Sequence, residues 1–378
     1  MELPGIYIHI PFCRSRCSYC DFATDIYEGG MADRYVDALT SEIVRFERDD
    51  ARSPVDTVYF GGGTPSMLSS DQLARILDAV LTRFHVVSGA EITMEMNPGT
   101  LTPEILSAFR AHGVNRASFG AQTFDDGELK RLGRRHTADD VRQTIDHLRL
   151  AGFDNVSFDL IAGLPAQILE AWERNMDQAL ALRPEHLSLY LLEVHEGTPL
   201  ADQIRKGQQP IPDDDLAAEM YEMLVAKTAA AGYEHYEISN FALPGYASRH
   251  NSKYWTGAPV FGFGCSAHSY DGSRERWSNE RDTARYVELI IANDTPVVET
   301  IVLNEQQVRA ESIFLSLRML RGVDLRIHQE RFGVDLRTEY RDDLARLTEA
   351  GLIEFDHDLL RLTPHGALMS NEVFAAFV

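Results

Sequence analysis

The sequence predicts an α/β protein in which a partial (βα)6 barrel, similar to a TIM barrel, precedes a smaller α+β domain of winged-helix type. Three observations support this fold class. Strand-like and helix-like segments alternate through the first two-thirds of the chain. Polar side chains follow the ends of several strand-like segments, which is where βα barrels carry their active sites. From about residue 305 the chain turns helical, and it ends near a short pair of strand-like segments.

Six strand-like segments, each followed by a helix-like segment, define the barrel. The expected strands cover residues 6–10, 55–60, 91–96, 117–122, 156–163 and 186–194, and the expected helices cover residues 32–46, 69–84, 102–113, 137–152, 168–182 and 216–232. Ser69 and Gln72 have the spacing of a capping box, and Thr102 with Pro103 marks a helix start. Six consecutive βα units imply a parallel sheet with helices outside, and their even spacing favours a barrel. Residues 233–241 predict one further strand.

The chain divides into three predicted parts. Residues 1–235 form the barrel domain, residues 236–300 form a connecting segment rich in glycine and aromatic residues, and residues 301–378 form the C-terminal domain. Helices followed by a short strand pair are typical of a winged helix, which often binds DNA. Because this segment is acidic on balance, we interpret it as a packing or docking domain. Its exposed surface could support a homodimer, so we expect a monomer or a homodimer.

The charge of the chain argues against some classes of partner. The 378 residues carry a formal net charge of −22, whereas nucleic acids and anionic membrane surfaces attract clustered lysine and arginine. We therefore expect no nucleic acid partner. No apolar run has the length of a membrane span, and the first ten residues lack the features of a secretory signal. These features predict a cytoplasmic protein.

Three of the four cysteines, Cys13, Cys17 and Cys20, fall within eight residues. Thiolates are the usual ligands of iron–sulfur clusters and four are normal, so three leave one iron open. An open iron can bind the amino and carboxylate groups of S-adenosylmethionine (SAM). A zinc site would need a fourth ligand, such as His9, and normally shows paired CxxC spacing. The pattern therefore predicts a [4Fe-4S] cluster in preference to zinc.

The spacing CxxxCxxC is the signature of the radical SAM superfamily, and longer motifs narrow the resemblance. The sequence contains, in this order, IYIHIPFCRSRCSYCDF, YFGGGTPS, MEMNPG, FGAQTF and FDLIAGLP. These motifs resemble the branch of the superfamily that contains oxygen-independent coproporphyrinogen III oxidases and heme chaperones. The resemblance covers nearly the whole chain, including the C-terminal domain, and implies a radical SAM barrel.

A glycine run, residues 61–63, follows the second strand. Such a run lets the backbone approach a ligand and presents N–H donors, although a tight turn alone would also explain it. The resemblance implies a SAM pocket formed by Tyr7, Gly62, Gly63, Thr64, Glu95, Gln122, Arg134 and Asp159, with a weaker match at Glu193. Carboxylates suit ribose hydroxyls and an ammonium group, and arginine suits a carboxylate. A structural salt bridge is the alternative for each charged member, and for Arg134 in particular.

Two features separate oxidases from heme chaperones within this branch. The oxidases carry a fourth cysteine where this chain has Phe22, and a long extension before the cluster, whereas Cys13 here comes almost at once. Both features favour a chaperone that binds heme and transfers it to an acceptor protein. The alternatives are a radical SAM coproporphyrinogen III oxidase and, from a different class, a zinc-stabilised acidic adaptor. In a chaperone the cluster and SAM have three candidate roles: structural support, gating of transfer, or reductive cleavage of SAM.

The resemblance also implies a heme site. Residues 249–255, RHNSKYW, match an HNxxYW motif associated with heme binding, and histidine is a common ligand of heme iron. His250 is therefore the candidate ligand, although a His–Asn pair that orders a loop over the barrel mouth would explain the motif equally. Cys265 and His268 are alternative ligands. The expected small molecules are a [4Fe-4S] cluster, SAM and heme. The expected partner is a heme-acceptor protein, for which a respiratory protein that brings peripheral membrane contact is one candidate.

Overall fold

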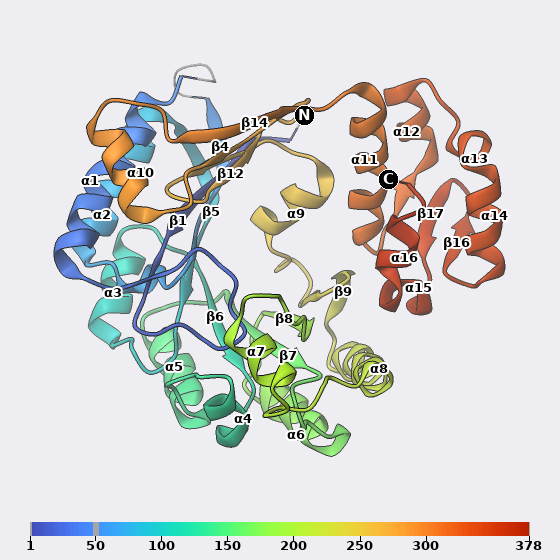
Figure 1. Ribbon diagram of the computed structural model, residues 1–378, viewed down its shortest axis with the longest axis horizontal. Helices are drawn as coiled ribbons and strands as arrows, with labels where there is room; N and C mark the ends of the chain where they lie inside the picture. Colours follow the sequence, from blue (N-terminus) through green and yellow to red (C-terminus); the bar gives the residue numbers. More distant parts are fainter. Residues whose placement is uncertain (1, 48–52, 378) are drawn as a thin grey trace.

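The structure is a computed structural model that describes residues 2–47 and 53–377 (Figure 1). Its main feature is a twelve-stranded sheet with the strand order β14-β13-β12-β11-β1-β4-β5-β6-β7-β8-β10-β9. The middle of this sheet is parallel and contains the six predicted strands. They are β1 (Gly5–Ile10), β4 (Pro54–Gly62), β5 (His85–Met96), β6 (Arg116–Gln122), β7 (Val156–Ala162) and β8 (His186–Leu191).

Helices follow these strands and confirm the predicted alternation. The six predicted helices are α1 (Gly29–Arg45), α2 (Ser70–Arg83), α3 (Pro103–Ala111), α5 (Ala138–Leu150), α6 (Leu169–Ala181) and α8 (Asp214–Ala230). Smaller elements lie in the loops between them: β2 (Phe12–Cys13), β3 (Asp25–Ile26), η1 (Pro65–Met67), α4 (Asp126–Arg131) and α7 (Pro199–Arg205). The Ser69 side chain accepts a hydrogen bond from the backbone N–H of Gln72, so the predicted capping box begins α2. The helices lie on the outer face of the sheet in Figure 1.

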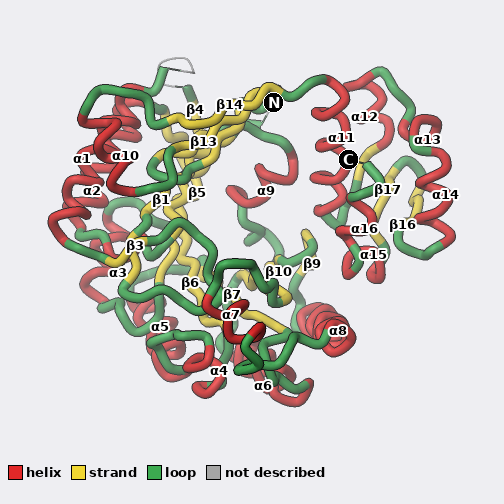
Figure 2. The backbone as a smooth tube through the Cα atoms, viewed as in Figure 1, coloured by secondary structure: helices red, strands yellow, loops and turns green. Residues whose placement is uncertain are grey.

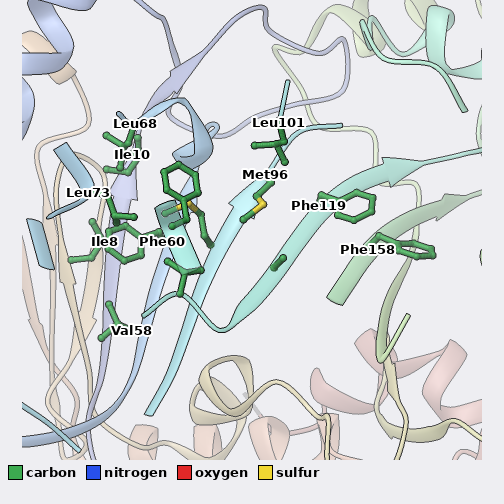
Figure 3. Packing of buried hydrophobic residues seen from close by; sticks show 14 of the residues in the cluster. Ile8, Ile10, Val58, Phe60, Leu68, Leu73, Met96, Leu101, Phe119 and Phe158 are labelled. Atoms are coloured by element: carbon green, nitrogen blue, oxygen red, sulfur yellow. The ribbon is translucent and has the colours of Figure 1, made fainter. Parts of the chain in front are cut away.

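The outer face of the strands is apolar and packs against the helices. Ile6, Ile8 and Ile10 of β1 are fully buried in the main core cluster. Figure 3 shows Ile8 and Ile10 packed near Phe60 of β4 and Leu73 of α2. Side chains alternate between the two faces of a strand, so the same strands present their intervening residues to the inner face.

The inner face of the parallel strands is polar. The pairing register places Tyr7, Tyr59, Thr93 and Arg116 side by side on β1, β4, β5 and β6. The interior of a TIM barrel is normally filled with branched apolar side chains. A polar interior instead requires hydrogen-bonding partners for its buried groups, which water or a polar ligand can supply.

Residues 234–302 extend the sheet at both sides of the parallel region. These strands are β9 (Glu234–Glu237), β10 (Asn240–Ala242), β11 (Val260–Phe263), β12 (His268–Tyr270), β13 (Glu275–Asn279) and β14 (Val297–Val302). The last two are connected by α10 (Thr283–Ile291). β11 pairs in parallel with β1, whereas β10 pairs antiparallel with β8. Within the described ranges no pairing joins β9 to β14, so the barrel is partial, as predicted.

The single strand predicted for residues 233–241 is corrected to a hairpin of β9 and β10. The Glu237 carboxylate accepts hydrogen bonds from the backbone N–H of Ser239 and from the side-chain amide of Asn240. These bonds close a turn inside the predicted strand and reverse the chain.

The C-terminal domain has a core and a sheet of its own (Figure 2). Its elements are α11 (Glu305–Arg318), β15 (Val323–Asp324), α12 (Leu325–Phe332), α13 (Leu336–Glu339), α14 (Arg341–Glu349), β16 (Ile353–Asp356), β17 (Leu359–Leu362), α15 (Pro364–Leu368) and α16 (Ser370–Phe374). Helices followed by the antiparallel pair β16–β17 agree with the winged-helix-like domain predicted from the sequence.

The C-terminal domain meets the barrel at the β9–β10 turn. Ile238 of this turn belongs to the core of the C-terminal domain, and its N–H donates to the carbonyl of Arg318 at 3.1 Å. A β-bridge also joins Glu237 to Met319. Among the helices of the described residues, none is both long and apolar enough to cross a membrane.

Candidate active site

The cysteine loop begins at the carboxyl end of β1 and is closed by the parallel pair β2–β3. The backbone fixes this loop across the barrel at Ser18. Its N–H donates to the carbonyl of Leu132 at 3.0 Å, and its carbonyl accepts from the N–H of Leu200 at 2.8 Å. The loop is therefore held at the end of the strands where βα barrels bind their substrates.

A cavity of about 520 Å³ lies under this loop. Its volume is in the range of small-molecule sites. Its wall brings together most of the predicted site residues: Cys13, Cys17, Cys20, Gly62, Gly63, Glu95, Gln122, Arg134 and Asp159. Glu193, the weaker match, and Phe22 also line it. The three remaining predicted residues, Tyr7, Thr64 and His250, lie outside this lining.

The glycine turn after β4 contacts the cysteine loop directly. Gly63 donates its N–H to the carbonyl of Ile10 at 2.8 Å. A Cβ atom added to Gly63 would lie 2.8 Å from the backbone carbonyls of Pro11 and Phe12. Gly62 adopts φ +109°, which favours glycine, and it donates its N–H to Glu95 at 3.1 Å. The turn therefore needs glycine to bring β4 against the loop that carries the cysteines.

Thr64 lies beside the cavity, behind its wall. Its hydroxyl is 3.5 Å from the Cys13 sulfur and accepts a hydrogen bond from the Asn97 amide at 2.7 Å. Tyr7 lies deeper in the barrel, where its hydroxyl is 3.1 Å from Nδ1 of His9 and its ring stacks on Tyr59. Both residues support the walls of the cavity through their neighbours.

Two half-buried carboxyl groups on the cavity lining, those of Glu95 and Asp159, give the cavity a preference for cations. Burial raises the pKa of Glu95 to about 7 and the pKa of Asp159 to about 6. The Tyr59 hydroxyl donates to Glu95 at 2.7 Å. A cation in the cavity would favour the ionised form of both carboxyls. The ammonium and sulfonium groups of SAM are cations, so this donor set fits that ligand.

Arg134 connects the cysteine loop to the inner strands. Its guanidinium donates to the Cys17 sulfur at 3.5 Å, to the Asn97 side chain at 3.0 Å and to the Gly120 carbonyl at 2.6 Å. These contacts use most of its donors on groups that line the cavity, so they hold Cys17 in a defined place.

Burial favours the protonated form of two of the three thiols. Burial raises the pKa of Cys13 and of Cys20. Iron binds thiolates, so cluster assembly must release protons from these residues. Tetrahedral zinc holds all its ligand atoms within about 2.0–2.3 Å of one centre. In the described part of the chain, no three histidine, cysteine or acidic side chains converge in that way. All three thiols line the same cavity.

His250 lies at the opposite end of the strands from the cysteines. The RHNSKYW segment forms a helix, α9 (Arg249–Thr256). The alternative expectation, that this segment is a loop over the barrel mouth, is therefore wrong. The first backbone N–H groups of α9, those of Arg249 and His250, each donate to the Glu91 carboxylate at 3.0 Å. In Figure 1, α9 lies between the sheet and the C-terminal domain.

Both ring nitrogens of His250 have partners. Nδ1 is 2.9 Å from the Thr57 hydroxyl, and Nε2 is 3.1 Å from the Tyr254 hydroxyl. Burial lowers the pKa of His250 to about 3, so the ring is neutral. Heme iron could bind either nitrogen only after one of these contacts broke. The predicted role of His250 as a heme ligand stays a prediction, as do the alternatives Cys265, which is buried, and His268, which is exposed.

Sequence reasoning missed several residues that the structure brings to the cavity: Asn97, Tyr190, His195, Ser239 and Arg318. Asn97 and His195 each follow a predicted strand within three residues, so their place at a strand end could have identified them. Arg318 had no such signal, because it reaches the cavity from the C-terminal domain.

The comparisons with known proteins agree with this geometry. The model of the radical SAM superfamily matches residues 7–179, and the model of the HemN C-terminal domain matches residues 303–369. The protein called heme chaperone HemW from Bacillus subtilis (strain 168) is 38% identical over 377 residues, which span 100% of this chain and 99% of that protein. The chain belongs to the HemW family. A HemW protein of Mycobacterium tuberculosis (strain ATCC 25618 / H37Rv) is 36% identical and covers 98% of this chain, with 93% of its own length.

The fold of this HemW-family chain also matches a solved structure. The coproporphyrinogen III oxidase HemN from Escherichia coli superposes with a TM-score of 0.87 at 25% sequence identity, covering 100% of this chain and 90% of HemN. That protein is described as a radical SAM enzyme. Membership of the superfamily implies a [4Fe-4S] cluster and SAM, and the cysteine loop and cavity of this HemW-family chain fit both.

Proposed function

We propose that this protein binds heme and transfers it to an acceptor protein, on a radical SAM scaffold. The observation that carries the proposal is the full-length similarity to proteins named heme chaperone HemW. Phe22 supports it, because this residue stands where the resemblance places a fourth cysteine in the oxidases. The phenylalanine ring lines the cavity and is largely exposed.

Different residues of the site would hold the cluster and SAM. Cys13, Cys17 and Cys20 would hold the [4Fe-4S] cluster, which with SAM supplies one-electron chemistry when both are bound. Arg134 keeps Cys17 in place through its contact with the sulfur. Glu95 would accept hydrogen bonds from the cationic or ribose groups of SAM, which we expect at the glycine turn.

A second candidate function is that of a coproporphyrinogen III oxidase, favoured by the close superposition on HemN. The two functions differ in what happens to a porphyrin. A chaperone retains heme and changes nothing in it, whereas an oxidase consumes coproporphyrinogen and releases the product.

An anaerobic titration separates the two. The protein is reconstituted with iron and sulfide, titrated with hemin, and followed by optical spectroscopy, while the same sample is assayed with coproporphyrinogen, SAM and a reductant. We expect stoichiometric heme binding without turnover. Turnover without stable heme binding would overturn the chaperone proposal and establish the oxidase.

The cluster assignment has its own test. Cys17→Ala should lose the cluster, because two thiolates hold a four-iron cluster poorly. Cys265→Ala is the matched control, since Cys265 is buried outside the cavity. Iron and sulfide are measured after reconstitution of both variants. Equal iron contents in the two variants would contradict the assignment.

A further inference from the structure

His195 stands apart from the other histidines of the chain. Among the described residues it is the only histidine that lines the cavity. It follows β8 in the loop before α7, at the same end of the sheet as the cysteines. Thr198 fixes this loop, because its hydroxyl donates to the carbonyl of His195 at 2.7 Å.

The His195 ring can accept a metal without breaking the fold. Its side chain is 44% exposed, and its nearest charged neighbours are carboxylates at 3.6 Å (Glu193, from Nε2) and 3.9 Å (Asp21, from Nδ1). Both distances exceed hydrogen-bond length. By contrast, the buried rings of His9, His186 and His250 each have both nitrogens within hydrogen-bond distance of a partner.

The surroundings of His195 suit a flat, apolar ring system. Phe22, Tyr190 and Val194 are large side chains that are 62%, 41% and 38% exposed. Phe22 and Tyr190 line the cavity with His195. Aromatic and apolar side chains bury a macrocycle well.

A cation in the lining of the cavity suits the acidic edge of heme. Arg16 lines the cavity and is exposed, whereas Arg318, which also lines it, already pairs with the Glu237 carboxylate. Guanidinium groups pair with carboxylates in a forked geometry, and heme carries two carboxylates on one edge. Apolar side chains, a histidine and an exposed arginine that line one cavity together match the chemistry of heme.

We propose that His195 is the protein ligand of heme iron, with heme seated at the mouth of the cavity above the cluster loop. This inference rests on the proposed heme-binding function. Asp21 faces Nδ1 and would orient the ring, which leaves Nε2 for the iron, since metal-binding histidines usually donate their other N–H to a carboxylate. Glu193, whose side chain is 76% exposed, can turn away from Nε2.

This assignment differs from the motif-based ligand, His250, in a testable way. His250 lies at the amino ends of the strands, and its Nδ1 and Nε2 contact the Thr57 and Tyr254 hydroxyls. A heme at His195 would share the cavity of the cysteines, whereas a heme at His250 would sit at the far side of the barrel interior.

The test compares hemin titrations of the reconstituted protein and its variants by optical and electron paramagnetic resonance spectroscopy. His195→Ala should lose the histidine-ligated signature and raise the heme dissociation constant at least ~10-fold. Added imidazole should restore the signature. His195→Gln should behave alike, and unchanged iron–sulfur content and circular dichroism show that both variants fold.

Two further histidine variants serve as controls for the hemin titration. His357→Ala removes an exposed histidine from the C-terminal domain and should change nothing. His250→Ala should keep the signature of the wild-type protein. A native spectrum in His195→Ala, or loss of the signature in His250→Ala alone, would overturn the assignment. Failure of the wild-type protein to bind hemin would overturn the proposed function itself.

Discussion

Arg134 shows how one side chain can organise a cofactor site. It reaches across the barrel mouth from the loop after α4 and contacts Cys17, Asn97 and Gly120. Asn97 in turn donates to Thr64, which lies next to Cys13. Two of the three cysteines are thus tied to one hydrogen-bond network.

Arg134→Met should weaken cluster binding about 10-fold, the lower end of the effect expected for groups that support metal ligands. Methionine keeps the bulk and removes the donors that hold Cys17. Iron release to a chelator, followed in the reconstituted protein, measures the effect. Arg135→Met is the control, because Arg135 is exposed. Equal release rates in the two variants would show that the Arg134 contacts do not support the cluster.

At the scale of single residues, some features of the site could be predicted from the sequence and others could not. Glu95 and Asp159 could be assigned to the cavity through the family resemblance, and Glu95 also lies close to the carboxyl end of its predicted strand. The raised pKa of Glu95 could not be foreseen, since it depends on burial between strands. The bond from Tyr59 to Glu95 likewise depends on the register of β4 against β5.

The turn after β4 is the element that positions the cysteine loop. Gly63→Ala should lower the free energy of unfolding by about 1–3 kcal/mol, because the new methyl group would collide with backbone carbonyls that cannot move independently. The same collision should displace the loop and reduce iron incorporation. Thermal unfolding and iron analysis measure the two effects.

Gly29→Ala is the matched control for this substitution. Gly29 begins α1, and a Cβ atom there would have no neighbour within 4 Å. Alanine in a helix is stabilising relative to glycine, so this variant should melt no lower than the wild-type protein. If Gly63→Ala matched it in both measurements, close packing of the turn on the loop would be disproved.

At the scale of elements, the sequence predicted the strands that a local pattern of apolar residues defines. It did not predict the strands that are defined by their pairing with other strands. The strands of the parallel region were foreseen because apolar residues such as Ile6, Ile8 and Ile10 alternate with polar ones. The short strands β9 to β14 carry little pattern, and two of them, β10 and β11, pair with the sequence-distant strands β8 and β1. The place of α9 depends on Glu91, which is over 150 residues away and accepts its first N–H groups.

At the scale of the whole molecule, Arg318 links the C-terminal domain to the cavity. It lines the cavity, lies 4.2 Å over the ring of Trp255, and forms an ion pair with the fully buried Glu237 at 3.9 Å. The order of the two domains could be predicted from the sequence. Their contact could not, because it joins three side chains from separate segments.

Arg318→Met should destabilise the protein by about 1–3 kcal/mol, through the lost cation–π contact and the buried carboxylate left without its cation. Adding Glu237→Gln should recover part of this loss, because it removes the stranded charge. Urea unfolding of both single variants and the double variant measures the coupling. Arg321→Met serves as an exposed control. Strictly additive effects would mean that Arg318 and Glu237 do not interact.

The position of β1 between β4 and β11 also determines when its two sides are paired during synthesis of the chain. β1 ends at Ile10, whereas its neighbour β11 begins at Val260. At roughly 5–20 residues per second, the ribosome reaches β11 about 12–50 s after it has made β1. Until then β1 has only β4 as a neighbouring strand and is an edge strand of the sheet. The three thiols are thus made early, and each new chain carries a complete ligand set for tens of seconds before β11 completes the sheet beside β1.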